Sequence, residues 1–402
     1  MKKLLFSALL LVSGLSANAQ LAPGSVAPNF TISAYQPWLA AAGTTNNGSY
    51  TLYDYLDQGY TVILDVSATW CGPCWNYHLT GALEDVYTAH GPAGAPGVSS
   101  TTTDDVMVIW IEGDGTTADA TMLDGNGAIG NWIEPAAGTQ IQFPMANPAS
   151  ASATQINNDY NIAYFPTIYR ICPNRIITEI GQATAANIYT AIGACPAPAS
   201  QPTDVAALNY TGALVHCEGA YTPSVQIQNN GTTALTSATV TITMGGTTVS
   251  TGTFSGNLAT YGVANVTCSP IAAFMGGALA VTVTTTGDAS ATNNATSATI
   301  ASATNAVSQF VTVNITTDYY ASETSWNIKN STGAVVAQGG GSWADMTTGA
   351  AGQTVQTPVQ VTLSPSQCYT FEILDAYGDG ICCNYGNGAY SVTDALGAVV
   401  AS

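Results

Sequence analysis

Two cysteines separated by two residues, Cys71 and Cys74, are the side chains of this chain best suited to chemistry. The apolar, β-branched run Val62–Val66 precedes them, and apolar residues recur at helical spacing after them. This order predicts a strand, a turn, the dithiol and a helix. At the first turn of a helix, unpaired backbone N–H groups face the sulfur of Cys71 and favour its thiolate, which is the attacking nucleophile. Cys74, one turn deeper, would then be the resolving thiol.

Other uses of this spacing have to be weighed. Zinc sites also use Cys-x-x-Cys, but they need two further ligands, and the sequence holds no second Cys-x-x-Cys. A static structural disulfide is the second alternative, since an exported protein need not meet a reductant. The strand-to-helix context favours a redox-active disulfide over both. His78 shares a helix face with Cys74, yet a packed or surface histidine is favoured there over a metal or acid–base role.

Residues 70–74, Trp-Cys-Gly-Pro-Cys, resemble the active-site motif of thioredoxin. Asp65 falls where that family keeps a buried acid, so the resemblance implies a proton-relay role for it. A solvated strand end is the alternative, but its apolar neighbours belong to a central strand and favour burial. The resemblance also implies substrate contacts from the residues beside the cysteines: Trp70, Gly72 and Pro73.

A second stretch resembles thioredoxin where a Pro-Thr pair opens a strand. In that family the proline is cis and lies against the dithiol, which implies the same for Pro166. A proline has no N–H, and it leaves the preceding backbone free to pair with an extended substrate. The resemblance thus implies that Pro166 guides the substrate, on a platform formed by Phe165, Pro166 and Thr167.

An α/β domain has to position these residues. Val106–Ile111 is typical of a buried parallel strand and closes a strand–helix–strand unit. We expect a closing hairpin over Arg170–Gly181, a final helix over Ala185–Ile192 and a further helix near Ala118–Ile133. Tyr50–Leu56 should form a short strand and a turn before the core strand.

The rest of the chain is typical of antiparallel β-structure, with short alternating strands between Asn-Gly and Gly-Gly turns. Residues 204–302 resemble the adhesion-type Ig-like modules of bacterial surface proteins. The fold class is therefore multidomain, α/β plus all-β. The predicted parts are a signal peptide (1–19), a thioredoxin-like domain (20–196), a linker (197–203), an Ig-like β-sandwich (204–302) and a second, C-terminal β-sandwich (303–402).

The C-terminal part has a signature of its own. Asp375–Cys383 resembles the Asp-x-Tyr-Gly-Asp-Gly-x-Cys-Cys signature of C-terminal β-domains in secreted proteins of the Bacteroidetes, as does Glu323–Trp326. Many such proteins continue into a sorting tail of the type IX secretion system, whereas this sequence stops at Ser402, so truncation stays an open question. Asp375 and Asp379 could bind calcium, with Asp318 and Glu323 as further oxygen ligands. A plain Asp-Gly turn is an equal alternative.

Nine cysteines in an exported chain permit structural disulfides and leave at least one thiol over. Sequence order suggests pairing within each domain. The adjacent cysteines near the C-terminus cannot both bond to the same partner, so we expect Cys382 to stay free. The expected structural disulfides are Cys172 with Cys195, Cys217 with Cys268, and Cys368 with Cys383.

Charge and the start of the chain limit the partners and the compartment. The sequence has 5 Lys and Arg residues against 24 Asp and Glu residues, a formal net charge of -19 at pH 7. Such a protein is a poor partner for nucleic acid or anionic membranes. Lys2-Lys3, the apolar run Leu4–Leu15 and Ala17-Asn18-Ala19 predict a cleavable signal peptide. We expect an exported protein, secreted, at the cell surface or in the periplasm, with no membrane span.

These observations predict a thiol–disulfide oxidoreductase that acts on protein disulfides or dithiols. It would require no cofactor, apart from the calcium considered for the C-terminal domain, and its electron donor is unknown. The Gly-Pro pair between the cysteines resembles that of reducing thioredoxins. The rival hypothesis is a cell-surface adhesion or structural protein with a non-catalytic thioredoxin-like module, because two of the three domains carry no visible chemistry.

Overall fold

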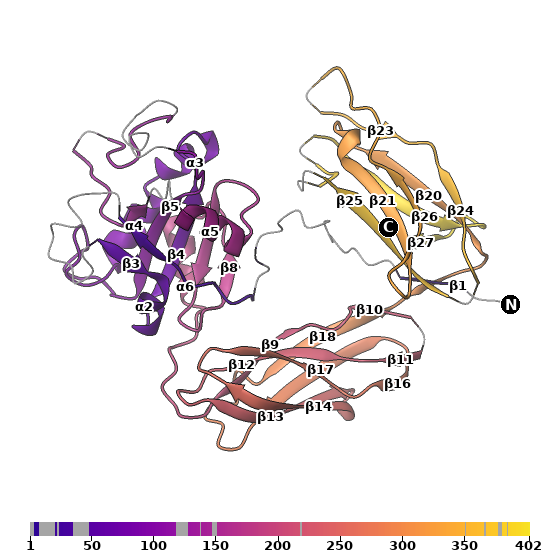
Figure 1. Ribbon diagram of the computed structural model, residues 1–402, viewed down its shortest axis with the longest axis horizontal. Helices are drawn as coiled ribbons and strands as arrows, with labels where there is room; N and C mark the ends of the chain where they lie inside the picture. Colours follow the sequence, from indigo (N-terminus) through magenta and orange to yellow (C-terminus); the bar gives the residue numbers. More distant parts are fainter. Residues whose placement is uncertain are drawn as a thin grey trace. The chain divides into compact units, whose positions relative to one another are not determined.

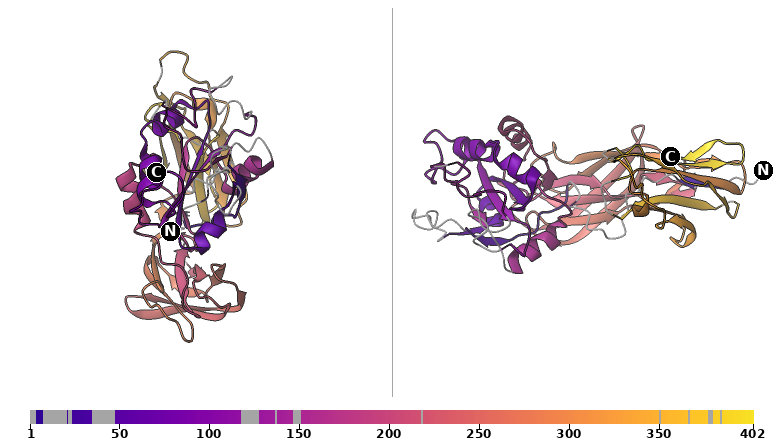
Figure 2. Two further views of the ribbon diagram at one scale, coloured as in Figure 1. Left: turned by 90° about the vertical axis from the view of Figure 1, so that its left-hand side faces the viewer. Right: turned by 90° about the horizontal axis from the view of Figure 1, so that it is seen from above.

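A computed structural model describes residues 4–7, 21, 24–34, 48–117, 128–136, 138–146, 151–217, 219–349, 351–365, 367–376, 380–383 and 385–402. Its chain divides into two compact units. The first unit comprises Asn18–Pro202 and Asn230–Thr232, and the second unit comprises the remainder. Figure 1 labels the elements of both, and Figure 2 shows them from two further sides. In the described residues, no helix has the length and apolar character to cross a membrane.

A five-stranded sheet forms the centre of the first unit, in the order β6-β5-β4-β7-β8 (Figure 1). The strands are β4 (Thr61–Ser67), β5 (Val106–Glu112), β6 (Met145–Ala146), β7 (Thr167–Ile171) and β8 (Ile177–Glu179). β4 runs parallel to β5 and antiparallel to β7. Every residue of β4 and β5 is buried. Continuous apolar runs suit them because both faces of such a central sheet are covered.

Helices and a small second sheet complete the first unit. They are β2 (Thr31–Ser33), β3 (Ser49–Thr51), α2 (Leu52–Asp57), α3 (Gly72–His78), α4 (Ala82–His90), α5 (Ala151–Tyr160) and α6 (Ala185–Ile192). α2 packs on β4, while α4 packs on β5 and on α6. The core joins the apolar residues of the sheet to large buried rings such as Trp110 and Trp132.

Several expectations for this unit match the observed elements. The predicted buried strand lies in β5, the closing hairpin is β7 and β8, and the final helix is α6. The strand and turn expected over Tyr50–Leu56 are wrong for most of that range. Its larger part belongs to α2, which buries Leu52 and Leu56.

The helix expected near Ala118–Ile133 falls mostly on residues that the structure does not describe, and it stays a prediction there. Residues 118–127 lie outside the described part, and residues 128–133 contain no helix. The Asn131 side chain accepts hydrogen bonds from the backbone of Ile133 and of Glu134, which favours a turn there. A helix does form further on, as α5, which was not predicted from the sequence.

The second unit contains two hydrophobic clusters, each enclosed by β-sheets (Figure 1, Figure 2). Around the first cluster lie β9 (Val205–Tyr210), β10 (Val215–His216), β11 (Gly219–Tyr221), β12 (Ser224–Asn229), β13 (Leu235–Met244), β14 (Thr247–Leu258), β15 (Val263–Thr267), β16 (Ile271–Phe274), β17 (Gly277–Thr284) and β18 (Ala295–Ser302). Their sheets have the orders β10-β18-β17-β13-β14, β15-β12-β9 and β11-β16. Alternation of buried and exposed residues in β17 fits a sheet with one wet face. The Ig-like type of this sandwich stays a prediction.

The second cluster lies between two further sheets, with the orders β19-β1-β25-β21-β22 and β23-β20-β26-β27, and β24 pairs with β20. The strands are β1 (Leu4–Ser7), β19 (Thr304–Ala306), β20 (Phe310–Thr317), β21 (Thr324–Asn330), β22 (Val335–Gly340), β23 (Thr354–Val355), β24 (Val359–Thr362), β25 (Cys368–Asp375), β26 (Ala389–Asp394) and β27 (Val399–Ala401), with a 3-10 turn at η2 (Ala321–Glu323). β1 falls within the predicted signal peptide, whose cleavage stays a prediction.

The cysteine connectivity differs from the expected one in the second unit. The structure links Cys172 to Cys195 in the first unit. The pairing of Cys217 with Cys268 is wrong, because Cys217, just after β10, is bonded to Cys368 at the start of β25. Cys268 is instead a buried free thiol whose sulfur faces the cluster around β15.

The pairing of Cys368 with Cys383 is likewise wrong. Cys383 is bonded to its neighbour Cys382, which therefore is not free. Domain membership and spacing cannot reveal these partners. One bond joins adjacent residues and the other joins residues 151 positions apart, and in both cases the pairing depends on where the strands place the cysteines.

Candidate active site

The dithiol lies where β4 gives way to α3. Cys71 is the N-cap of α3, and Pro73 occupies the first turn, where a missing N–H costs nothing. Cys71 and Cys74 are joined by a disulfide with a Cα–Cα distance of 5.3 Å. The Cys74 backbone N–H donates to the Sγ atom of Cys71 at 3.2 Å, so a donor already faces the sulfur on which a thiolate would develop. Cys71 is 5% exposed and Cys74 1% exposed, so an incoming group meets Cys71 first.

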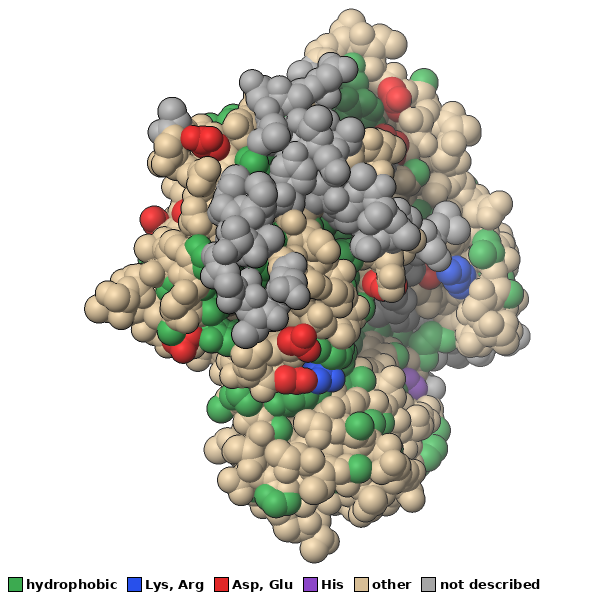
Figure 3. All heavy atoms as spheres, turned by 60° about the vertical axis from the view of Figure 1, so that its left-hand side comes forward, with side chains coloured by type: hydrophobic (Ala, Val, Ile, Leu, Met, Phe, Trp, Pro, Cys, Tyr) green, Lys and Arg blue, Asp and Glu red, His purple; other side chains and the backbone are tan. Residues whose placement is uncertain are grey.

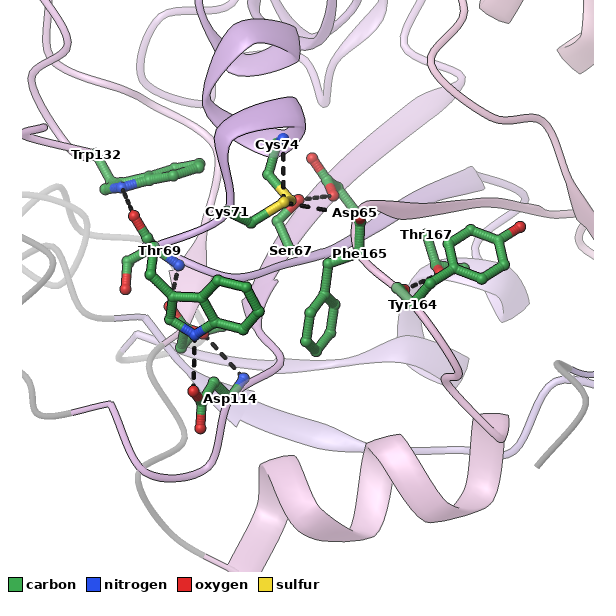
Figure 4. Close-up of a disulfide and its surroundings, with 12 residues drawn as sticks. Asp65, Ser67, Thr69, Cys71, Cys74, Asp114, Trp132, Tyr164, Phe165 and Thr167 are labelled. Atoms are coloured by element: carbon green, nitrogen blue, oxygen red, sulfur yellow. Dashed lines mark hydrogen bonds between the residues drawn. A yellow bond between two sulfur atoms is a disulfide. The ribbon is translucent and has the colours of Figure 1, made fainter. Parts of the chain in front are cut away.

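The segment before β7 lies beside this sulfur. The peptide bond between Phe165 and Pro166 is cis. The Phe165 carbonyl oxygen is 3.7 Å from the Sγ atom of Cys71, and Figure 4 shows Phe165 next to the disulfide. Thr167 is buried at the start of β7 and donates its hydroxyl hydrogen bond to the Tyr164 carbonyl at 2.7 Å, which holds the turn around the proline. A side chain at Gly113 would collide with the Phe165 ring, so glycine leaves that ring its place.

Two exposed aromatic residues are sequence neighbours of Cys71 and of Phe165. Trp70 is 52% exposed and Tyr164 is 54% exposed. The Trp70 ring meets the Phe165 ring edge to face, with a centroid distance of 6.1 Å. Its Nε1–H donates to the Oδ2 atom of Asp114 at 2.7 Å, and this bond fixes the orientation of the exposed indole. Solvent-exposed aromatic rings with a fixed orientation provide contact area for a binding partner.

Glu112, the last residue of β5, connects the turn before Cys71 with the segment that follows β5. It is buried, and its carboxylate accepts hydrogen bonds from the Thr69 backbone N–H and the Asp114 backbone N–H, each at 2.9 Å. Burial raises its pKa to about 7, against the effect of these N–H donors. The pKa of Asp114 is lowered by hydrogen bonds from the backbone and the hydroxyl of Thr116, and then by the bond from Trp70. Sequence reasoning missed both Glu112 and Asp114.

Asp65 is a buried acid of β4, with 2% of its surface exposed. The Ser67 hydroxyl donates to its Oδ1 atom at 2.6 Å. Burial raises the pKa of Asp65 to about 7; the bond from Ser67 opposes this rise and the charge of Glu84 adds to it. Figure 4 shows Asp65 beside the disulfide. A group that titrates near neutral pH can accept and return a proton at that pH.

His78 is a packed residue of the core. Its ring stacks on Trp132 with a centroid distance of 5.0 Å, and its Nε2 atom lies 2.9 Å from the Trp132 carbonyl oxygen. Burial lowers the pKa of His78 to about 4, so the ring is neutral at pH 7. The indole N–H of Trp132 donates to the Thr69 carbonyl at 3.1 Å and so helps to hold the turn before Cys71. The favoured interpretation of His78 as a packed side chain agrees with this environment.

The residues considered for calcium are only partly described. Asp375, at the end of β25, accepts a hydrogen bond from the Gly380 backbone N–H at 2.5 Å, while Asp379 lies outside the described residues. Asp318 is buried and accepts from the Tyr320 N–H at 3.0 Å. Among the residues that the structure describes, no group of three or more His, Cys, Asp or Glu side chains is arranged to hold a metal ion.

The sheet order, the dithiol at the start of α3 and the cis proline before β7 define the first unit as thioredoxin-like in fold. No family model and no curated protein matches the chain.

Solved structures resemble parts of the chain. The thioredoxin domain of a thiol-disulfide oxidoreductase from Bacteroides vulgatus has a TM-score of 0.29 and 16% identity, and covers 43% of this chain and 99% of that chain. A thiol:disulfide interchange protein from a Bacteroides species has a TM-score of 0.28 and 16% identity, with coverage of 42% and 88%. The CARDB domain of a Pyrococcus furiosus protein has a TM-score of 0.22 and 16% identity, with coverage of 26% and 96%.

Proposed function

We propose that the protein is an exported thiol–disulfide oxidoreductase that acts on protein disulfides through Cys71 and Cys74. The observation that carries the proposal is the position of the Cys71 sulfur. It accepts the Cys74 N–H at 3.2 Å, and it lies 3.7 Å from the carbonyl oxygen that precedes Pro166. The Cys74 N–H can stabilise a thiolate on Cys71, and the nearby carbonyl can accept a hydrogen bond from the backbone of a substrate. This arrangement suits thiol–disulfide exchange with a polypeptide.

The reaction starts from the reduced dithiol. The Cys71 thiolate attacks one sulfur of a substrate disulfide, forms a mixed disulfide and releases the other substrate sulfur as a thiolate, which takes up a proton. The Cys74 thiol then loses its proton and attacks the Cys71 sulfur. The substrate leaves as a dithiol, Cys71 and Cys74 become a disulfide, and two electrons have passed to the substrate. A donor of unknown identity restores the dithiol, and the exchange itself uses only cysteine sulfur.

Asp65 serves the second step. Cys74 is 1% exposed, so its proton has to reach a group inside the protein. Asp65 is buried beside the disulfide, and with a pKa of about 7 it can take that proton at neutral pH. Ser67, which donates to the carboxyl at 2.6 Å, holds Asp65 in place for the transfer.

The substrate is an extended segment that contains a disulfide. Its backbone N–H would pair with the Phe165 carbonyl, and Pro166 would keep its own side of the groove free of a competing N–H donor. Trp70 and Tyr164 offer exposed apolar surface. Figure 3 shows a face of the molecule covered mostly by uncharged groups, with isolated acidic side chains and few basic ones.

Reduction of insulin disulfides by dithiothreitol tests the proposal. The protein should accelerate the reaction, and Cys71→Ser should abolish the acceleration. The matched control replaces Cys172 and Cys195 with serine, which removes another disulfide of the first unit with the same Cα–Cα distance of 5.3 Å. That variant should keep activity below its melting temperature. No acceleration by the wild type, or full acceleration by Cys71→Ser, would contradict the proposal and favour a structural or adhesive role.

A trapping experiment tests the order of the steps. Cys74→Ser leaves the attacking sulfur but removes the resolving one, so a mixed disulfide with a protein substrate should accumulate. Non-reducing electrophoresis would show this adduct, and dithiothreitol would reduce its disulfide and release the substrate. Cys71→Ser should form far less adduct, since the remaining Cys74 sulfur is buried. Equal adduct with both variants would show that Cys71 is not the first nucleophile.

A further inference from the structure

The bond between Cys382 and Cys383 is not explained as a stabilising cross-link. A disulfide restricts the unfolded chain more as the loop that it closes becomes longer. This bond joins residues one position apart, compared with 23 positions for Cys172–Cys195 and 151 for Cys217–Cys368. Its effect on the unfolded chain is therefore the smallest of the three. A different use has to account for it.

The same bond is the most accessible one. Of the four disulfides in the described residues, it is the one in which both cysteines are exposed to solvent. Thiol–disulfide exchange requires a thiolate to approach the sulfur pair from outside, so exposure decides which disulfide an external thiol can open. Exposed disulfides are accordingly the labile or regulatory ones.

Within the described residues, the segment that carries the bond is attached to the C-terminal sandwich at Gly380, whose N–H donates to the Oδ2 atom of Asp375 at 2.5 Å, and at Tyr385. We define the cysteine loop as residues 380–383 and 385–388, between β25 and β26. Its two sides meet through the bridge between Cys382 and Asn387 and the hydrogen bond from the Gly388 N–H to the Ile381 carbonyl at 2.8 Å. The disulfide thus belongs to the base of a small hairpin.

The far end of the cysteine loop docks through the carbonyl group and the ring of Tyr385. The carbonyl oxygen of Tyr385 accepts the Tyr319 N–H at 3.2 Å and the Gly352 N–H at 2.9 Å. The Tyr385 ring meets the Tyr320 ring edge to face at 5.1 Å. Gly386 lies so close to Gly352 that a Cβ atom would collide with the Gly352 carbonyl. Docking therefore depends on the backbone positions of Tyr385 and Gly386, which follow the disulfide closely in the sequence.

We propose that Cys382 and Cys383 form a second thiol–disulfide exchange site, and that opening their bond releases the cysteine loop from Tyr319 and Gly352. The closed bond includes the peptide between the two cysteines in one ring, which restricts the backbone at the base of the hairpin. Opening it frees these torsions, and the docked conformation loses its advantage over undocked ones. The inference does not depend on the chemistry of Cys71 and Cys74.

The reductant is a low-molecular-weight thiol or a protein dithiol. Its thiolate attacks one of the two sulfurs and expels the other as a thiolate, which is then protonated. A second reductant thiol attacks the mixed disulfide, and the reductant leaves as a disulfide. Two electrons and two protons have then converted the bond to the thiols of Cys382 and Cys383, while the reductant has been oxidised.

The test uses the full chain with Cys71→Ser and Cys74→Ser, so that the first site cannot contribute and failure of one proposal is separate from failure of the other. After incubation with glutathione without denaturant, thiols are alkylated and located by mass spectrometry. We expect alkylation of Cys382 and Cys383 while Cys172 and Cys195 stay bonded. Alkylation of the pair without any reductant, or resistance until urea unfolds the chain, would overturn the proposal.

Hydrogen exchange measures the second half of the proposal. The amides of Tyr319 and Gly352 should exchange about five- to tenfold faster after reduction, as expected when a hydrogen bond of ordinary strength is lost. Amides of β17 should not change. The double substitution Cys382→Ser with Cys383→Ser should show the fast exchange with or without glutathione. Unchanged exchange in the reduced protein, or slow exchange in this variant, would show that the bond does not control docking.

Discussion

Replacement of Asp65 by asparagine should stabilise the folded protein, and more so at pH 8 than at pH 5. Asparagine has nearly the same shape and keeps an oxygen that can accept the Ser67 hydroxyl, which now donates to Asp65 at 2.6 Å. It cannot ionise. The substitution therefore removes the free energy that the fold spends on holding a carboxylate in a site that is 2% exposed.

The magnitude follows from the pKa of Asp65. Burial raises it from 3.8 to about 7 in the folded state. Between these two values the unfolded chain has lost its proton while the folded chain keeps it, so ionisation favours unfolding and stability falls as the pH rises. With ~1.4 kcal/mol for each pKa unit, the cost is roughly 2 kcal/mol at pH 5 and roughly 4 kcal/mol at pH 8. Asp65→Asn should remove most of this cost at each pH.

Urea unfolding at pH 5 and pH 8, followed by fluorescence, measures the effect. The gain of Asp65→Asn over the wild type should grow by roughly 2 to 3 kcal/mol between the two pH values. Asp54→Asn is the matched control, because Asp54 is exposed on α2 and its substitution should give nearly the same small change at both pH values. A gain that does not depend on pH would refute the assignment of a raised pKa to Asp65. The variant should also resolve mixed disulfides more slowly.

Three further predictions concern other parts of the chain. Gly113→Ala should cost roughly 1–3 kcal/mol in the free energy of unfolding and reduce insulin reduction, because the new methyl group displaces the Phe165 ring; thermal unfolding and the activity assay check this. Loss of the Cys172–Cys195 bond, by serine at both positions, should cost about 3 kcal/mol in urea unfolding, and an unchanged midpoint would contradict the closure of a loop of 23 residues. Cys268, with a pKa raised by burial to about 11, should resist iodoacetamide at pH 8 until the protein unfolds; rapid labelling of the native protein would show that its site is open.

The core of the first unit could be predicted because several signals agree there. The β-branched run before Cys71 leads into a helix, and the observed α3 begins directly after that cysteine. A buried acid at Asp65 follows from its place within the apolar run Val62–Val66, since its neighbours on both sides must face the core. Burial of this kind is a property of the pattern and needs no knowledge of distant residues.

The partners of Trp70 and Thr69 could not be predicted in the same way. Glu112 and Asp114 come from β5 and its end, more than 40 positions along the chain. One signal was present, because β4 and β5 are parallel and their carboxyl ends meet at one edge of the sheet, so the acids after β5 had to lie near the dithiol. The cysteine partners gave no such signal. The bond from Cys217 to Cys368 depends on the ends of β10 and β25, which alternation alone does not bring together.

Glu112 has a consequence for the choice of substrate. One carboxylate holds both the turn before Cys71 and the residue that anchors Trp70, so these two segments cannot adapt separately. The edge that carries the dithiol is therefore stiff, and in the proposed exchange the conformational adjustment falls on the substrate. Disulfides in mobile loops or in incompletely folded chains can make that adjustment at little cost. A disulfide locked inside a finished domain cannot, and we expect discrimination between the two to arise from this rigidity rather than from recognition of sequence.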